Sequence, residues 1–178
     1  MNLKLELSEF WKWSKKTPNE YSKNRGNGEW ETEYPNWEKL LITLGQAIHR
    51  LNDNYEFKTA ELLIQGLAID NESELVLDKI EKELIDKNTF VEQVIDSNQP
   101  QAKWQIAELL GNIKLKNATS FLKILTEDTN KYVKRRALLS LHKIDKMEAK
   151  KTARKYIHDN DEYLKMISTK IINETLNH

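Results

Sequence analysis

The stretches AKWQIAELLGNI (Ala102–Ile113) and VKRRALLSLHKI (Val133–Ile144) carry the same apolar pattern at an offset of 31 residues. The matched pairs are Ala102 with Val133, Ile106 with Ala137, Leu110 with Leu141 and Ile113 with Ile144. Apolar residues that recur every three and four positions lie on one face of an α-helix. The chain therefore repeats one amphipathic helix at a fixed interval.

A third copy of this helix follows the second at the same offset. It begins DNDEYLKMISTKII at Asp159, and the segments NATSFLKILTED from Asn117 and MEAKKTARKYIH from Met147 lie between the copies as expected second helices. Two helices per unit at a period near 30 residues are typical of an α-solenoid, in which each pair buries its apolar face against its neighbours. We therefore predict an all-α fold.

The second copy resembles a bacterial HEAT repeat in a set of positions followed by a second helix. These are Val133, Arg136, Ala137, Leu141 and Ile144, preceded by an Asp. The resemblance covers roughly Asp96 to Ile172 and implies a short right-handed α-solenoid. The chain departs from the family pattern at Lys134, where the family prefers Arg. HEAT repeats serve as scaffolds in different settings, so the fold implies no particular activity.

The segment 37–96 continues the helical pattern in less regular pairs. An amphipathic helix is expected after Pro35 and Asn36, and further helices are expected to begin at Asn54, Ser73 and Asn88, whose side-chain oxygens could accept a first-turn N–H. Short joints predict antiparallel neighbours. We expect nine or ten helices in a single domain spanning 1–178, the last six forming HEAT-like pairs within 97–178.

The first 36 residues are rich in aromatic side chains. Four of the five Trp lie between Ser8 and Trp37, and we expect a short helix over 9–16 followed by an extended loop. One interpretation is an aromatic N-terminal cap that covers the open apolar face of a terminal repeat. The other is a recognition loop, with Trp30 and Tyr34 as candidate partner-binding residues, because Trp and Tyr are enriched at binding hot spots.

The composition favours helices and a single hydrophobic core. The 178 residues are 39% hydrophobic and 31% charged, with five Gly, three Pro and no Cys. This length allows one sizeable core, and the scarcity of Gly and Pro disfavours turn-dense β folds. The N-terminus lacks the pattern of a signal peptide and no apolar run reaches membrane-spanning length, so we expect a soluble, cytoplasmic protein with no membrane partner.

No pattern in the sequence predicts a catalytic site. The four His residues have no second ligand at helical spacing, and neither a phosphate-binding glycine loop nor a nucleophile motif is present. Acidic pairs such as Glu72 with Glu74 are ordinary for solvated helix faces. We expect a protein that is not an enzyme and that binds neither metal nor cofactor.

The charge of the chain is zero overall but strongly segregated along the sequence. The segment 53–96 holds 12 acidic and 4 basic residues, and the segment 131–155 holds 10 basic and 2 acidic residues. Their net charges are therefore −8 and +8. Such blocks can each attract a partner of opposite charge.

The acidic block favours a protein partner with a basic face. The candidate partner-binding carboxylates here are Asp70, Glu72, Glu74, Asp78 and Glu81, which we expect to form a negative surface next to the aromatic segment. Charges steer such an encounter while a few aromatic residues supply affinity. The chain is similar in length and pattern to small HEAT-like immunity proteins, which neutralise toxins of contact-dependent growth inhibition. We therefore expect a toxin inhibitor that occludes the active site of a basic toxin domain.

The basic block suggests the alternative of nucleic-acid binding. Lys150, Lys151, Arg154 and Lys155 share one face of an expected second helix, and in HEAT stacks the second helices line the concave surface. A concave basic strip would contact phosphates, in a way that resembles HEAT-like DNA glycosylases. Lys134 and Arg135 are the further basic residues of this alternative, and Trp104 is its candidate stacking residue.

The basic residues of the second repeat helix have different expected roles. The repeat pattern predicts that Val133, Ala137, Leu141 and Ile144 belong to the repeat core, so we expect Lys134 and Arg135 on the outer face of the helix. Arg136, next to the small Ala137, is expected to reach a carboxylate between repeats. The carboxylates predicted for that pair are Asp128 and Asp159.

Overall fold

The computed structural model describes residues 2–175 and is all-helical over that range, which confirms the all-α prediction. The elements are α1 (Leu3–Ser14), α2 (Pro18–Lys23), the 3-10 helix η1 (Trp30–Glu33), α3 (Trp37–Asp53), α4 (Phe57–Ile69), α5 (Leu75–Glu83), α6 (Lys87–Asp96), α7 (Pro100–Asn112), α8 (Ala118–Thr126), α9 (Lys131–Ile144), α10 (Lys146–Ala153) and α11 (Glu162–Ile172). The part that the structure describes thus holds eleven α-helices, more than the nine or ten expected.

The chain divides into two compact units. Unit 1 comprises Met1–Gln105 and unit 2 comprises Ile106–His178, so the boundary falls inside α7. Unit 1 carries 13 basic and 19 acidic residues, a net charge of −6, and unit 2 carries 15 basic and 9 acidic residues, a net charge of +6. That residues 1–178 fold cooperatively as a single domain stays a prediction.

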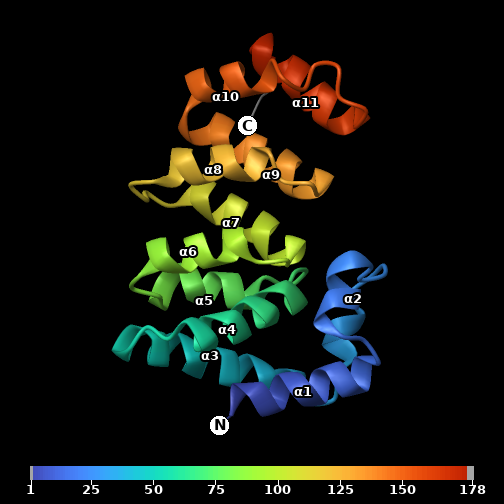
Figure 1. Cartoon of the computed structure of the whole chain (residues 1–178), viewed down its shortest axis with the longest axis vertical. Coiled ribbons are helices and arrows are strands. Elements are labelled where there is room, and N and C mark those ends of the chain that lie inside the picture. Colours follow the sequence, from blue (N-terminus) through green and yellow to red (C-terminus); the bar gives the residue numbers. More distant parts are fainter. Residues whose placement is uncertain (1, 176–178) are drawn as a thin grey trace. The chain divides into compact units, whose positions relative to one another are not determined.

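Helices α3 to α6 form the body of unit 1. Helix α3 packs on α4 and α5, α4 also contacts α6, and α1 lies against α3 and α4 (Figure 1). Leu40, Leu44, Ile48 and Leu51 form the buried stripe of α3. Gly66 of α4 faces Leu44 so closely that a β-carbon there would overlap the leucine side chain. The two helices therefore approach at a contact that only glycine permits.

The helices of unit 1 begin at other residues than the sequence predicts. Helix α4 follows Glu56 rather than Asn54, and α5 follows Glu74, whose φ of 55° is left-handed. Helix α6 is capped by Asp86, which accepts a hydrogen bond from the N–H of Thr89. The predicted caps Asn54, Ser73 and Asn88 were wrong, because carboxylate residues occupy the position before each helix.

The N-terminal segment folds into a cluster of aromatic rings. Phe10, Tyr21 and Tyr34 are buried, and Phe10 meets the ring of Tyr34 edge-on at 5.4 Å between centroids. Trp13 and Trp30 stack at 6.0 Å. In place of the expected extended loop, the segment contains α2 and η1. The aromatic side chains therefore pack largely against one another.

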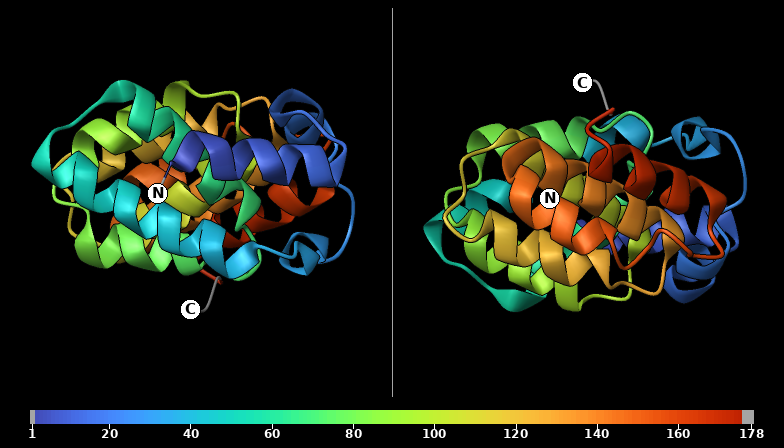
Figure 2. Two further views of the ribbon diagram at one scale, coloured as in Figure 1. Left: turned by 90° about the horizontal axis from the view of Figure 1, so that it is seen from below. Right: turned by 90° about the horizontal axis from the view of Figure 1, so that it is seen from above.

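Helices α8 to α11 pack in sequence within unit 2. Helix α9 contacts α8, α10 and α11, and α10 contacts α11; Figure 2 shows α10 and α11 side by side. Val133, Ala137 and Leu141 are fully buried on α9, as the repeat pattern predicts, whereas Ile144 at the end of the helix is 37% exposed, so its assignment to the core was wrong. Leu164, one period later, is fully buried on α11.

The 31-residue period is visible in the backbone. Helices α7, α9 and α11 begin at Pro100, Lys131 and Glu162, three positions spaced by 31 residues. The side chain of Asp128 accepts a hydrogen bond from the N–H of Asn130 at 2.7 Å, and Asp159 accepts one from Asp161 at 2.8 Å.

The same turn precedes the first of these helices. Ser97, a further 31 residues before Asp128, accepts a hydrogen bond from the N–H of Gln99 at 3.3 Å. The repeat thus includes its turn as well as its helix. From residue 97 onward the described chain holds five α-helices, where six were expected.

Candidate functional site

Two of the predicted partner-binding residues lie inside the protein. Asp70 is 1% exposed: its carboxylate accepts hydrogen bonds from the hydroxyl of Ser73 at 2.5 Å and from the N–H of Val76 at 2.6 Å. Burial raises the pKa of Asp70, although these hydrogen bonds act in the opposite direction. Asp70 fixes the turn from α4 to α5, so its assignment to a partner surface is corrected.

Tyr34 is the second. It is 4% exposed because its ring packs between Phe10 and Trp13. Trp30 is half-buried, and its indole N–H donates to the carbonyl of Arg25 at 3.2 Å. Among the predicted aromatic contacts, only the exposed part of Trp30 is therefore available to a partner.

A buried polar network joins the aromatic segment to the turn after α4. Tyr21 donates a hydrogen bond to Glu31 at 2.5 Å, and Arg25 donates to both oxygens of Glu31 at 2.7 and 3.0 Å. Asn71 donates to the hydroxyl of Tyr21 at 3.0 Å. Burial, together with the hydrogen bond to Glu31, raises the pKa of Tyr21. The network holds the segment in one position and gives it a structural role.

The other predicted acidic residues differ in their surroundings. Glu72 pairs with Arg25 at 3.0 Å, and Asp78 pairs with Lys82 one turn later at 3.0 Å. Glu74 is half-buried before α5, whereas Glu81 is exposed on α5. The predicted acidic surface is thus formed by Glu72, Asp78 and Glu81.

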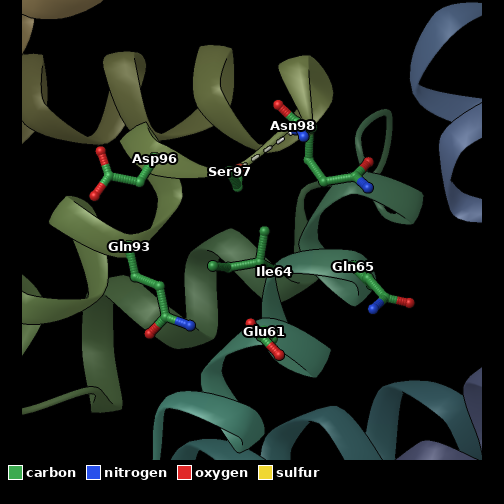
Figure 3. Close-up of a pocket in the computed structure, with 8 residues that line it drawn as sticks. Glu61, Ile64, Gln65, Gln93, Asp96, Ser97 and Asn98 are labelled. Atoms are coloured by element: carbon green, nitrogen blue, oxygen red, sulfur yellow. Dashed lines mark hydrogen bonds between the residues drawn. The ribbon is translucent and has the colours of Figure 1, made fainter.

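A pocket of about 340 Å³ opens in unit 1 between α4, the end of α6 and the turn before α7 (Figure 3). Its lining consists of Glu61, Ile64, Gln65, Gln93, Asp96, Ser97, Asn98 and Gln99. Four of these eight residues carry carboxamides and two carry carboxylates. Ile64 points into the opening between them in Figure 3. The pocket therefore offers many hydrogen-bonding groups around one apolar side chain.

The walls of this pocket are held by internal hydrogen bonds. The carbonyl oxygen of the Gln65 side chain accepts from the indole N–H of Trp11 at 3.2 Å. The side chain of Gln93 donates to the carbonyl of Phe57 at 2.8 Å and accepts from the hydroxyl of Tyr55 at 3.3 Å. These contacts fix two of the four carboxamides in place.

The pocket carboxylates are the exposed side chains of Glu61 and Asp96. Within residues 2–175, neither carboxylate takes part in an ion pair or a side-chain hydrogen bond. Within the same residues, Glu81 on α5 likewise takes part in no ion pair or side-chain hydrogen bond. Among the described residues, the pocket and α5 therefore carry three carboxylates that make no ion pair.

The predicted basic strip is turned toward neighbouring carboxylates. Lys150 pairs with Glu174, and Lys155 pairs with Glu127 at the end of α8. These lysines hold the pKa of each of the two glutamates below its usual range. Lys151 lies 3.7 Å from Glu148, while Arg154 is exposed. The positive charge of the strip is thus partly offset within unit 2.

The arginines of α9 make two inter-helix ion pairs. Arg136 donates a hydrogen bond to Glu108 of α7 at 2.7 Å. Arg135 donates to both oxygens of Asp161 before α11 at 3.0 and 2.5 Å. Arg136 therefore pairs with a carboxylate of another repeat helix, Glu108, which the sequence did not point to, while its pairing with Asp128 or Asp159 stays a prediction. The expected outer-face position of Arg135 was wrong, because Asp161 draws its side chain toward α11.

A second, smaller pocket of about 200 Å³ lies beside these arginines. Its lining is Tyr132, Arg135, Arg136, Leu139 and Tyr163. The guanidinium carbon of Arg135 lies 5.0 Å from the centroid of Tyr163, and that of Arg136 lies 5.1 Å from the centroid of Tyr132. Tyr132 and Tyr163 are 31 residues apart, so the repeat places one ring beside each arginine.

The remaining candidate sites of the sequence are not assembled. Across the described residues, no group of three His, Asp or Glu side chains converges to hold a metal ion. Trp104 is 9% exposed on α7, which leaves little of its face for stacking on a base. None of the described helices is long and apolar enough to cross a membrane.

The polar pocket was missed by the sequence reasoning. Its residues come from two helices and a turn that lie in two separate stretches of the sequence, 61–65 and 93–99. Gln and Asn residues are frequent on solvated helices, so their convergence depends on how α4 and α6 pack. Comparison with protein family models, curated proteins and solved structures finds no match to this chain.

Proposed function

We propose that this chain is a non-catalytic protein-binding module whose acidic unit 1 binds a basic protein domain. The most specific form of the proposal is a cytoplasmic immunity protein that neutralises a toxin by covering its active site. The observation that carries it is a contrast between three surface carboxylates of unit 1 and the basic strip of unit 2. Among the described residues, Glu61, Glu81 and Asp96 make no ion pair, whereas the strip lysines Lys150, Lys151 and Lys155 each pair with a glutamate.

Uncompensated surface carboxylates suit a basic partner for two reasons. They accelerate encounter with a positively charged protein, and they repel partners of the wrong charge. A negative patch also costs the folded protein some stability through self-repulsion. Carboxylates that have no cationic partner within the described chain are therefore stabilised when a positively charged partner binds.

The repeat supplies the scaffold in this proposal. The 31-residue recurrence of helix starts and of the Asp128 and Asp159 turns supports HEAT-like helix pairs from residue 97 onward. Repeat scaffolds present extended surfaces on rigid helices, which suits recognition of a folded domain. The right-handed solenoid and its HEAT identity belong to the proposal.

Nucleic-acid binding is the less favoured function. A phosphate that approaches Lys150 or Lys155 has to compete with the carboxylates already bound there. Exposed ion pairs of this kind are weak, so the competition lowers affinity without abolishing it. The basic strip then gives low-affinity, strongly salt-dependent binding to a duplex.

The experiment is a search for a stoichiometric complex with the products of neighbouring genes. The protein carries an affinity tag, is co-expressed with each neighbour, and the complex is sized by gel filtration with light scattering. The proposal expects a one-to-one complex with a basic domain that remains associated at roughly micromolar concentration. Failure of every neighbouring product to bind at that concentration overturns the immunity assignment.

A further inference from the structure

The polar pocket of unit 1 has a shape and charge that specify its ligand. Its volume of about 340 Å³ lies near the lower end of the range for small-ligand pockets. That size accommodates one long side chain with its terminal group. The walls carry the carboxylates of Glu61 and Asp96, and the one apolar residue of the lining, Ile64, is only 2% exposed (Figure 3).

The pocket is built on ordered elements. Glu61, Ile64 and Gln65 lie on α4, and Gln93 and Asp96 lie on α6. The turn that completes it is closed by Ser97, whose hydroxyl donates to the carbonyl of Val94 at 2.7 Å and accepts from the N–H of Gln99 at 3.3 Å. A site held on helices and a pinned turn loses little entropy on binding, which favours preorganised recognition.

The chemistry of the walls distinguishes between ligands. Two negative carboxylates exclude a phosphate or a carboxylate, because like charges repel at short range. A cation is favoured, and the additional amide oxygens offer acceptors at several positions. A guanidinium group carries five N–H donors in a plane and matches carboxylates in pairs, whereas an ammonium group acts as a point charge.

We propose that this pocket receives an arginine side chain of the basic partner, with the guanidinium between Glu61 and Asp96. This inference rests on the proposed function and deepens it by naming the anchor that the partner supplies. The site differs from the exposed acidic surface of Asp78 and Glu81. That surface attracts a cation at a distance, whereas the pocket would contact the cation directly. Arginine is among the residues that dominate binding energy at protein interfaces.

The proposal is tested first without the partner. The isotope-labelled full chain is titrated with N-acetyl-arginine methylamide, and the side-chain amide resonances of Gln65, Gln93 and Asn98 are followed by NMR. The expected result is saturable shifts at roughly millimolar concentration, as suits one isolated side chain. N-acetyl-lysine methylamide is expected to bind several-fold more weakly.

Two matched double variants distinguish the loss of charge inside the pocket from the loss of the same charge elsewhere on the surface. Glu61→Gln with Asp96→Asn is expected to weaken arginine binding at least tenfold. The control, Glu33→Gln with Glu38→Gln, removes the same charge from exposed positions outside the pocket and is expected to leave binding unchanged. Unchanged backbone spectra show that both variants fold. Absence of saturable shifts, or equal weakening by both pairs of substitutions, overturns the proposal.

The complex with the partner provides the second test. The pocket pair is expected to raise the Kd for the partner at least tenfold, and the control pair less than threefold. If arginine binds the pocket but the pocket pair leaves partner affinity unchanged, the assignment of the anchor is overturned. If arginine binds the pocket and no partner is found, the proposed function fails while the pocket remains an arginine site.

Discussion

Arg135 of α9 grips Asp161 through two parallel hydrogen bonds, from Nε to Oδ1 at 3.0 Å and from Nη2 to Oδ2 at 2.5 Å. The same Oδ1 accepts a hydrogen bond from the N–H of Leu164 at 2.8 Å and so caps α11. The carboxylate of Asp161 thus links α9 to α11 and caps the N-terminus of α11. The pair recurs nowhere else in the repeat, because Trp104 and Asn130 occupy the equivalent positions one period earlier.

Substitution of Asp161 separates its two roles. Asp161→Asn keeps a cap of similar strength and removes the charge, whereas Asp161→Ala removes both. We expect Asp161→Ala to lower the free energy of unfolding by about 1 kcal/mol more than Asp161→Asn, which is the usual cost of a lost cap. Urea denaturation followed by circular dichroism measures the difference. Equal losses for the two variants contradict the capping role.

The Asp161 pair also predicts a pH dependence. Burial alone would raise the pKa of Asp161, but the guanidinium of Arg135 and the N–H of Leu164 outweigh it and hold the pKa below its usual range. A carboxyl whose pKa is lowered by folding contributes stability above its unfolded pKa of about 3.9, and that contribution disappears as pH falls through the folded value. The stability gap between the native chain and Asp161→Asn should therefore be full at pH 7 and shrink below about pH 4. A gap that widens on acidification contradicts this account.

Gly111 lies where α7 meets α9. A β-carbon at this position would lie 2.9 Å from both Cβ and Oγ of Ser140 and 3.3 Å from its Cα. Gly111→Ala gains about 1 kcal/mol of helix propensity but forces the helices apart at a cost of roughly 1–3 kcal/mol. We expect a net loss of stability, measured as a lower melting temperature.

The matched control for Gly111→Ala is the double variant with Ser140→Gly. Removing the Ser140 side chain relieves the contact, so the two substitutions should be less destabilising together than the sum of their separate effects. A double-mutant cycle reports this coupling. Additive effects would show that the close approach of α7 and α9 is not the cause.

Glu31 holds the parts of the aromatic segment together. Its side chain is 3% exposed and binds Arg25 and Tyr21. Glu31→Ala leaves the half-buried guanidinium of Arg25 with Glu72 as its remaining partner and should cost about 3 kcal/mol, whereas Tyr21→Phe loses one hydrogen bond and should cost about 1 kcal/mol. Urea denaturation of both variants checks the ranking. A smaller effect for Glu31→Ala than for Tyr21→Phe contradicts the central position of the carboxylate.

The repeat helices of unit 2 could be predicted from the sequence because their pattern is local and periodic. Val133, Ala137 and Leu141 recur with their counterparts and are all fully buried. The helix boundaries were less certain, since the three predicted caps lie one or two residues away from the carboxylates that precede α4, α5 and α6. Several polar residues before each helix can serve as caps, and tertiary packing decides among them.

The sequence of the N-terminal segment contains the signature of a helix start, at α2, that we did not predict. Thr17 and Glu20 form a capping box around Pro18, and all three residues are visible in the stretch TPNE. The partners of Asp70 and Arg136 could not be predicted in the same way. Asp70 is buried by the turn that it stabilises, and Glu108 reaches Arg136 only through the packing of α7 on α9. Long-range pairs of this kind depend on the fold and not on spacing.

The basic strip provides a prediction against the alternative function. Lys151→Glu with Arg154→Glu reverses two exposed charges and should leave partner affinity within about threefold, because binding is assigned to unit 1. Fluorescence anisotropy with a labelled duplex at low salt should show only weak, salt-sensitive binding. Tight duplex binding that the double substitution abolishes would favour the nucleic-acid function.

The most direct test of the account is the affinity of the acidic unit for a basic partner from the neighbouring genes. Isothermal titration of the purified pair compares the native chain with a variant that carries Glu61→Gln, Glu81→Gln and Asp96→Asn. The account predicts a one-to-one complex whose Kd rises with salt and rises at least tenfold in the variant. A complex of unchanged affinity in the variant, or no complex at micromolar concentration, would contradict it.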